Sequence, residues 1–172
     1  MNKKNIIIVS IFILFIIGLA WWGKVVQKPV PVALGAPESA PEAGKGLLSA
    51  EEKFYDFGSI SMKDGKVSHL FKVSNQTDSD VILKQVVTSC MCTAAYVING
   101  ESKNGPFGMP GHGGSVPKVN DMIKAGEARE IEVVFDPNAH GPAGVGLIDR
   151  FITLTDATGE ELQLEIKATV TP

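Results

Sequence analysis

Strict alternation of apolar and polar side chains is the feature that most constrains the fold of this chain. In the segment ELQLEIKATV, residues 161–170, every second residue is apolar, and those between are Glu, Gln, Lys or Thr. Successive side chains of a β-strand point to opposite faces, so the pattern predicts a strand with one buried face. The segments VSHLFKVSN (67–75) and AREIEVVFDP (128–137) repeat it with few exceptions.

Two further segments, VILKQVV (81–87) and RFITLT (150–155), are rich in β-branched residues and predict strands buried on both faces. Turn-forming sequences such as KDG, NQTDSD, KAGE and DATGEE separate these runs. A single sheet of such strands would leave its apolar face in water. We therefore predict an all-β sandwich of about seven short antiparallel strands over residues 50–172.

The N-terminus predicts a membrane anchor over residues 1–23. Lys3 and Lys4 precede an apolar run from Ile6 to Trp22, which is about as long as the shortest spanning helices. Lysines favour the cytoplasmic side, and Trp21 and Trp22 suit the opposite interface. We expect residues 5–22 to cross the membrane and the C-terminal domain to be extracytoplasmic, in the periplasm or at the cell surface. A removed signal peptide, with a cleavage site in residues 33–36, is the alternative.

Residues 24–49 are rich in Pro, Ala and Gly and predict a flexible linker. The net charge of the whole chain is −3, and it shows no cluster of basic residues. Binding to nucleic acid requires clustered positive charge, so we expect no nucleic-acid partner.

Cys90 and Cys92, in the segment TSCMCT, are the only cysteines of the chain. On an extended strand, residues two apart face the same side, so both sulfurs are expected to lie together while Met91 points away. Three alternatives follow. The cysteines form a strained, easily reduced disulfide, which an oxidising compartment favours. They bind a soft metal ion, or they are two small buried residues.

A glycine-rich insertion over residues 99–120 bears on the metal alternative, because it carries Met109 and His112, and Met122 follows it. Together with Cys90 and Cys92, these residues form a set of ligands suited to Cu(I), if the flexible loop folds back over the thiols. The candidate metal ligands are therefore Cys90, Cys92, Met109 and His112, although their spacing matches no established motif.

The two remaining histidines are poorer candidates for a metal site. His69 shares a predicted strand face with Phe71 and Val73, which indicates a hydrogen-bonded core histidine. His140, in DPNAHGPAG, is interpreted as a turn residue.

Five segments resemble, in order, the bacterial family of domain of unknown function 1573: FYDFGSI, VSHLFKVSNQTDSDVIL, VVTSCMCT, IKAGEAREIEVVFDP and LQLEIKATV. The resemblance covers about residues 54–170. Ser89, Cys90, Cys92 and Thr93 match a family segment that usually reads Ser-Cys-Gly-Cys-Thr; here Met91 replaces the glycine. Ala125 likewise stands where a proline is frequent. The resemblance implies an immunoglobulin-like sandwich related to the ASH, MSP and hydin domains, but no established activity.

The sequence contains no recognisable phosphate loop or nucleophile elbow. We therefore expect no enzymatic activity. The first hypothesis is a membrane-anchored, extracytoplasmic immunoglobulin-like binding or scaffold domain with an envelope protein as partner and no cofactor. The alternative is a copper(I)-binding or thiol–disulfide module that uses the Cys-Met-Cys pair and the Met/His loop.

Overall fold

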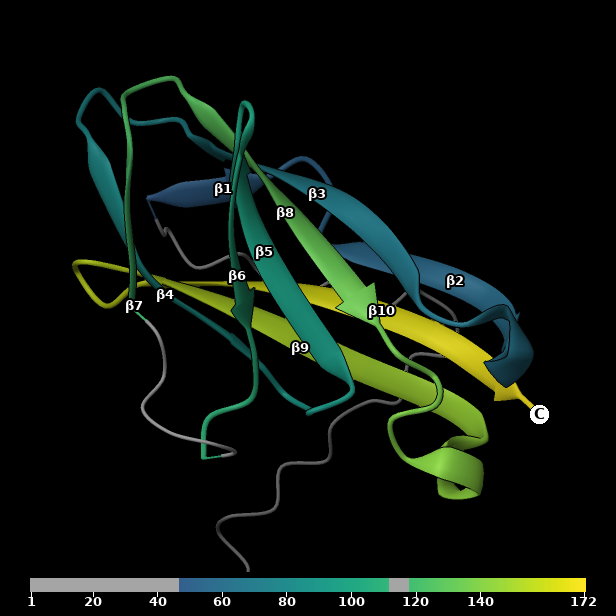
Figure 1. The fold of residues 1–172 in the computed structure, drawn as a ribbon. Coiled ribbons are helices and arrows are strands. Elements are labelled where there is room, and N and C mark those ends of the chain that lie inside the picture. The colour runs from purple at the N-terminus through teal and green to yellow at the C-terminus, as the bar shows by residue number, and fades with distance from the viewer. Residues whose placement is uncertain (1–46, 112–117) are drawn as a thin grey trace, which may run out of the picture. The chain divides into compact units, whose positions relative to one another are not determined.

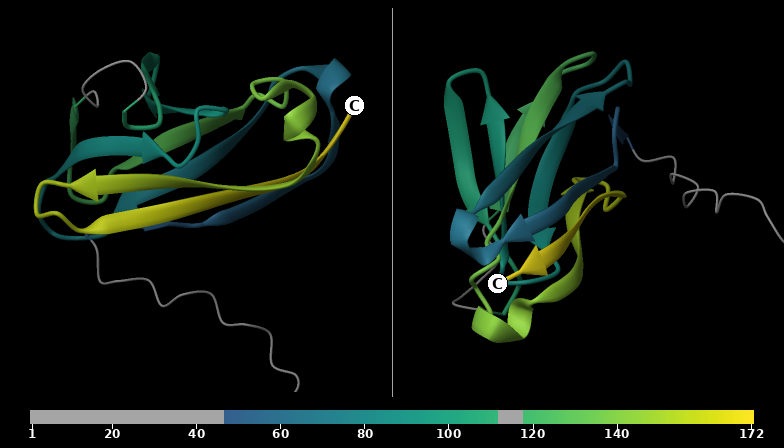
Figure 2. Two further views of the ribbon diagram at one scale, coloured as in Figure 1. Left: turned by 90° about the horizontal axis from the view of Figure 1, so that it is seen from below. Right: turned by 90° about the vertical axis from the view of Figure 1, so that its right-hand side faces the viewer.

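The computed structural model describes residues 47–111 and 118–172, which form a β-sandwich of two five-stranded sheets (Figures 1 and 2). We name them sheet A, with the order β1-β3-β8-β5-β6, and sheet B, with the order β2-β10-β9-β4-β7. The strands are β1 Leu48–Ala50, β2 Phe54–Ser61, β3 Val67–Asn75, β4 Val81–Thr88, β5 Thr93–Asn99, β6 Ser102–Phe107, β7 Lys118–Ile123, β8 Ala128–Phe135, β9 Gly146–Asp156 and β10 Glu161–Thr171; two short 3-10 helices are η1 Met62–Asp64 and η2 Gly141–Gly144.

The alternation seen in the sequence correctly predicts the inner faces of β3, β8 and β10. On each of these strands most apolar residues face the opposite sheet and most polar residues face solvent. The exceptions are Leu70, which is 50% exposed, and Asn75 and Arg129, which are buried. Because burial of each such side chain contributes roughly 1.5–3 kcal/mol, the shared interior holds the two sheets together. The fully buried apolar side chains of these strands include Phe71, Val73, Ile131, Val133, Leu164 and Ile166.

Over the described residues the sandwich has ten strands rather than the predicted seven or so. Five strands were not named from the sequence, and all of them except β5 lie at sheet edges: β1, β2, β5, β6 and β7. β1 occupies the end of the predicted linker, while β6 and the start of β7 lie within the predicted insertion at 99–120. These strands are short or carry no sustained alternation: five of the six residues of β6 are exposed.

One strand pairing is parallel, so the expectation of a wholly antiparallel sandwich was wrong. β2 pairs in parallel with β10, with Tyr55 opposite Ile166 and Ile60 opposite Val170. A pattern of alternating burial is the same for both strand directions, and it therefore carries no information on this pairing.

Strand β4 is not buried on both faces, contrary to prediction. Ile82 is 41% exposed, whereas Leu83 is fully buried. The pairing of β4 with both neighbours shifts register between Leu83 and Gln85, which returns Val86 and Thr88 to the inner face. In β9, likewise, only Ile152 and Leu154 of residues 150–155 are buried.

The predicted anchor, residues 1–23, and residues 24–46 of the predicted linker lie outside the described residues. Within residues 47–111 and 118–172, the structure shows no helix with the length and apolar character needed to span a membrane.

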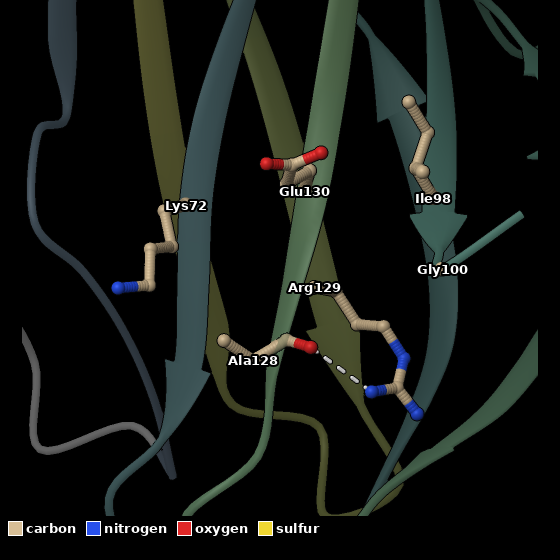
Figure 3. A pocket seen from close by; sticks show the side chains of 6 residues that line it. All are labelled: Lys72, Ile98, Gly100, Ala128, Arg129 and Glu130. Carbon is tan, nitrogen blue, oxygen red and sulfur yellow. Dashed lines mark hydrogen bonds between the residues drawn. The ribbon is translucent and has the colours of Figure 1, made fainter.

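Arg129 is a buried charge that links β8 to β7. Its side chain is 4% exposed, and its Nε donates to Asp121 at 2.6 Å. Nη2 donates to the carbonyl oxygen of Met122 at 2.6 Å, and Nη1 donates to Glu127 and to the carbonyl oxygen of Ala128. Arg129 also lines a depression of about 310 Å³ beside Lys72 and Glu130 (Figure 3). Since all three guanidinium nitrogens have partners, we interpret Arg129 as structural.

Candidate functional site

The two cysteines lie in the turn that connects β4 of sheet B to β5 of sheet A. Their predicted position on an extended strand was therefore wrong. The backbone N–H of Thr93 donates to the carbonyl oxygen of Cys90 at 3.1 Å, which closes the turn. The buried hydroxyl of Thr88 lies 3.0 Å from the carbonyl oxygens of both Cys90 and Thr93. These hydrogen bonds fix the path of the backbone from the end of β4 through the two cysteines.

Hydrogen bonds to two neighbouring segments hold this turn in place. The N–H of Ser89 donates to the carbonyl oxygen of Phe151 in β9, and the N–H of Phe151 donates to the hydroxyl of Ser89, both at 2.9 Å. The N–H of Asp136, which follows β8, donates to the carbonyl oxygen of Cys92 at 2.9 Å. The turn thus lies between β9 and the segment that leaves β8.

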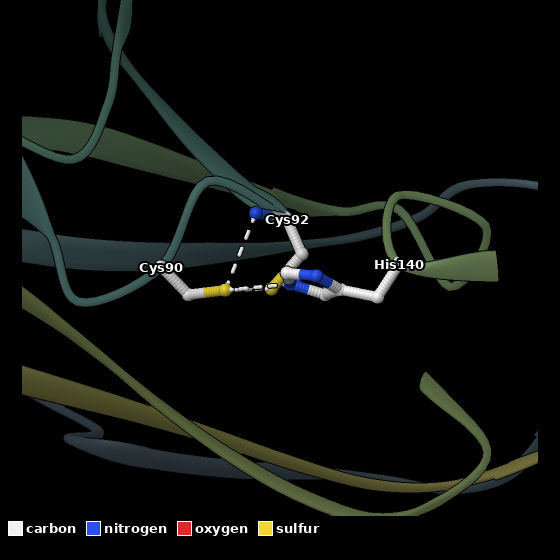
Figure 4. Close-up of side chains that lie close together, drawn as sticks. All are labelled: Cys90, Cys92 and His140. Atoms are coloured by element: carbon white, nitrogen blue, oxygen red, sulfur yellow. Dashed lines mark hydrogen bonds between the residues drawn. The ribbon is translucent and has the colours of Figure 1, made fainter. Parts of the chain in front are cut away.

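That segment carries His140 to the cysteines. His140 comes directly before η2, and the next residue, Gly141, has a φ of +55°, a conformation that favours glycine. Asn138 anchors the loop, because its Nδ2 donates to the carbonyl oxygen of Met62 at 2.7 Å. The Nε2 atom of His140 lies 3.2 Å from the Sγ atom of Cys90 (Figure 4).

The two sulfur atoms lie next to each other, as the sequence predicted, although the turn rather than a strand brings them together. Their separation is 2.6 Å, and the Cys92 thiol is placed to donate to the Cys90 sulfur. Cys92 is 3% exposed, whereas Cys90 is partly accessible. Arg150, on β9, donates from Nε to the Cys92 sulfur at 3.2 Å. Each sulfur therefore has a second partner: His140 for Cys90 and Arg150 for Cys92.

The surroundings drive the pKa values of the two thiols apart. Partial burial raises the pKa of Cys90, but hydrogen bonds from the thiol and the backbone N–H of Cys92 and from His140, with the charge of Arg150, outweigh it and lower this pKa to about 7. Burial, followed by the hydrogen bond to Cys90, raises the pKa of Cys92 despite the opposing effect of Arg150. Near neutral pH, Cys90 is accordingly the thiolate of the pair.

The structure places the residues of the predicted Met/His loop as follows. Met109 is partly buried and follows Gly108, whose carbonyl oxygen accepts from the N–H of Thr88 at 3.3 Å. Met122 lies on β7 and is 52% exposed. His112 lies outside the described residues. Metal binding by Cys90 and Cys92 with Met109 and His112 stays a prediction.

His140 and Arg150 are the site residues that the sequence did not reveal. His140 was correctly interpreted as a turn residue, but it was considered poorly placed for the cysteines, and the structure corrects this. No local motif connects it to Cys90, because the contact joins two inter-strand connections. Arg150 lies in a predicted strand whose alternation is irregular. The sequence therefore did not indicate that its side chain faces Cys92.

His69 is hydrogen-bonded, as predicted, but lies at the edge of the core. Its Nε2 is 2.9 Å from a carboxylate oxygen of Glu52, and its ring stacks on Tyr55 with the centroids 3.6 Å apart. Its side chain is 21% exposed. His69 thus has a structural role and is a suitable control for His140.

Comparison with known proteins finds a match to one family model and a similarity of fold. Residues 48–106 match the model of the family described as protein of unknown function (DUF1573), which confirms the resemblance seen in the sequence. A search of curated proteins finds no match.

Among solved structures, a protein of unknown function from Porphyromonas gingivalis W83 is similar, with 14% identity and a TM-score of 0.52; the match covers 76% of this chain and 50% of that one. The secreted serine protease VesC from Vibrio cholerae (13% identity, 73% of this chain and 24% of that one, TM-score 0.45) and the CupB2 chaperone of Pseudomonas aeruginosa (12% identity, 71% and 55%, TM-score 0.38) are less similar. The chain thus spans about half the length of the Porphyromonas protein, and the likeness to it concerns the fold alone.

Proposed function

Residues 48–106 of this chain match the model of the DUF1573 family, and from the geometry of its two cysteines we propose that the chain is a thiol–disulfide module. The observation that carries the proposal is the pair of adjacent sulfurs, 2.6 Å apart, of which one is accessible and the other is buried. Thiol–disulfide exchange needs an accessible thiolate that attacks and a second thiol that resolves the product. The pair has this arrangement.

The proposed reaction begins at Cys90. Its thiolate attacks one sulfur of a partner disulfide, which forms a mixed disulfide and releases the other partner sulfur as a thiolate that takes up a proton. The Cys92 thiol then loses its proton and attacks the Cys90 sulfur, which forms the Cys90–Cys92 disulfide and releases the second partner sulfur. The partner disulfide is reduced to two thiols while the chain's dithiol is oxidised, and the reverse sequence oxidises a partner dithiol.

Neighbouring residues support this division of roles. The hydrogen bonds that lower the pKa of Cys90 to about 7 supply a thiolate at neutral pH. Arg150 lies against the sulfur that must become the second thiolate, and its positive charge stabilises that anion. The turn also brings the two sulfurs to 2.6 Å from each other, which favours an internal disulfide more than an extended strand would.

The proposal includes the location and the partner expected from the sequence. An anchor over residues 1–23 would hold the domain on the extracytoplasmic side of the cell membrane, where disulfides persist. The expected envelope protein would then be the partner in the mixed disulfide, so that the binding role and the exchange role coincide. The immunoglobulin-like form expected from the resemblance is in keeping with two facing sheets whose turns and connections present the cysteines. We still predict no enzymatic activity. The proposed exchange can occur once per chain and does not require the chain to turn over as a catalyst.

Trapping the mixed disulfide tests the proposal. The full chain is purified in detergent, reduced, and incubated with oxidised glutathione, and its mass is measured after acid quenching. We expect the wild type to lose two hydrogens with no lasting adduct, because Cys92 resolves the intermediate. The Cys92→Ser variant should accumulate one glutathione on Cys90.

The matched control is Cys90→Ser, which leaves only the buried thiol and should react at least tenfold more slowly. Equal rates of adduct formation in the two single variants, or a wild type that retains glutathione, would contradict the proposed roles.

A further inference from the structure

The geometry points to a soft metal site in which His140 joins the two cysteines, and we propose that the reduced chain binds one Cu(I) ion through Cys90, Cys92 and His140. This inference rests on the proposed function to the extent that the reduced dithiol is the binding form. It differs from the sequence-based ligand set, in which the nitrogen ligand was His112.

Distances support a common ion. One donor atom from each of Cys90, Cys92 and His140 lies within 4.8 Å of the other two. Because metal–sulfur and metal–nitrogen bonds are about 2.0–2.3 Å long, two ligands of one ion lie at most about 4.6 Å apart. The donor atoms therefore need only small side-chain movements to share one ion. The sulfurs must separate from 2.6 Å to about 4 Å to share an ion in a trigonal arrangement, which side-chain rotation of the accessible Cys90 can supply.

Chemistry and charge select the ion. Thiolates are soft ligands that favour Cu(I), and imidazole also binds copper. Two thiolates and Cu(I) together carry one negative charge, which the guanidinium of Arg150, 3.2 Å from the Cys92 sulfur, neutralises. A divalent ion would leave one uncompensated positive charge in a half-buried site, which is unfavourable. The site therefore discriminates against Zn²⁺, which in proteins usually has four ligands.

The position of His140 suits a ligand. Its ring reaches the cysteines from the connection between β8 and β9, so the ligands come from two chain segments that meet at the cysteines (Figure 4). Hydrogen bonds of Asn138 and Asp136 hold this connection against η1 and the cysteine turn. Binding would thus bridge two connections that the fold already holds together.

Titration with Cu(I) under anaerobic, reducing conditions tests the inference. The full chain in detergent competes for Cu(I) with a coloured chelator, and we expect one ion per wild-type chain. His140→Gln should weaken binding at least tenfold, whereas the matched control His69→Gln should bind as the wild type does. X-ray absorption of the loaded wild type should show two sulfur ligands and one nitrogen ligand.

Four results would overturn the inference: no Cu(I) bound by the wild type, unchanged affinity in His140→Gln, a spectrum with sulfur ligands alone, or stronger binding of Zn²⁺ than of Cu(I). The glutathione reaction separates this failure from failure of the proposed function. A chain that cycles between dithiol and disulfide but binds no Cu(I) would refute only the metal site.

Discussion

The Nε2 atom of His140 lies 3.2 Å from the Sγ atom of Cys90, although fifty positions separate the two residues in the chain. The contact joins the connection between β4 and β5 to the connection between β8 and β9. The contact gives the partly accessible thiol of Cys90 a polar partner. The buried sulfur of Cys92 instead accepts a hydrogen bond from Arg150. This division of partners makes two cysteines of similar sequence surroundings chemically different.

Removal of His140 should make Cys90 less reactive near neutral pH. Burial raises the pKa of Cys90, but its hydrogen bonds, including that with His140, lower it to about 7. The thiolate forms as the pH rises through the pKa, so the alkylation rate of metal-free, reduced wild type should rise through a midpoint near pH 7. In His140→Ala the midpoint should move upward, which reduces the rate at pH 6.5 about threefold or more.

Alkylation by iodoacetamide, followed by peptide mass spectrometry, measures this rate for Cys90 separately from Cys92. His69→Ala is the control, since that ring contacts Glu52 and Tyr55 instead. A midpoint in His140→Ala equal to that of the wild type would refute the role assigned to His140.

Replacement of Arg150 should slow the resolution of a mixed disulfide. Burial raises the pKa of Cys92, and the hydrogen bond and charge of Arg150 oppose this effect. Arg150→Gln should therefore raise that pKa further and leave less Cys92 thiolate to attack. At pH 7 we expect the glutathione adduct on Cys90 to persist about three- to tenfold longer.

The adduct's lifetime is measured by quenched mass spectrometry, with Lys84→Gln as a control that removes one exposed positive charge from β4. If both variants resolve the adduct at the wild-type rate, Arg150 has no role in the exchange.

The sequence predicted the fold to the extent that the fold depends on local alternation. Phe71, Ile131 and Leu164 lie inside because their strands alternate with few exceptions. The register shift beside Leu83 reverses the alternation within β4, and one face of this strand, which includes Ile82, is exposed although the sequence predicted burial of both faces. Edge strands such as β6 have one neighbour and few buried residues. Their sequences therefore show little alternation of apolar and polar residues.

The candidate site was predicted only in part, for a related reason. Cys90 and Cys92 were recognisable because they are adjacent in sequence and are the only cysteines. Their partners, His140 and Arg150, come from distant segments of the chain. The alternation of apolar and polar residues does not indicate which connections between strands lie close together in the fold. The sequence placed His140 in a turn, but only the pairing of β8 with β5 brings that turn to the cysteines.

Removal of Arg129 should destabilise the sandwich strongly. Its side chain is 4% exposed and is paired with Asp121 and Glu127. Arg129→Met would leave the carboxylate of Asp121 and the carbonyl oxygen of Met122 without their donor. We expect a loss of about 3–5 kcal/mol in the free energy of unfolding, measured by urea denaturation.

Lys72→Met is the control for Arg129, because Lys72 pairs with Glu51 on the surface and its loss should have a small effect, within about 1 kcal/mol. Equal destabilisation by the two substitutions would show that the buried network does not hold β7 to β8.

The two leucines Leu164 and Leu147 test the assignment of inner and outer faces. Leu164, on β10, is fully buried, whereas Leu147, on the adjacent β9, is 78% exposed. Leu164→Ala should lower the free energy of unfolding by about 2–5 kcal/mol, because it removes buried contacts and leaves a cavity. Leu147→Ala should change it by no more than about 0.5 kcal/mol. A larger effect at Leu147 than at Leu164, in the same denaturation assay, would reverse the assigned faces.

The most direct test of a reversible Cys90–Cys92 couple is its equilibrium with glutathione. The full chain is equilibrated at a series of ratios of reduced to oxidised glutathione, quenched with acid, and analysed by mass spectrometry. The proposed function predicts two interconverting species, the dithiol and an internal disulfide lighter by two hydrogens, with the same midpoint from either direction. A chain that keeps two free thiols at every ratio, or that forms only glutathione adducts or disulfides between chains, would contradict it.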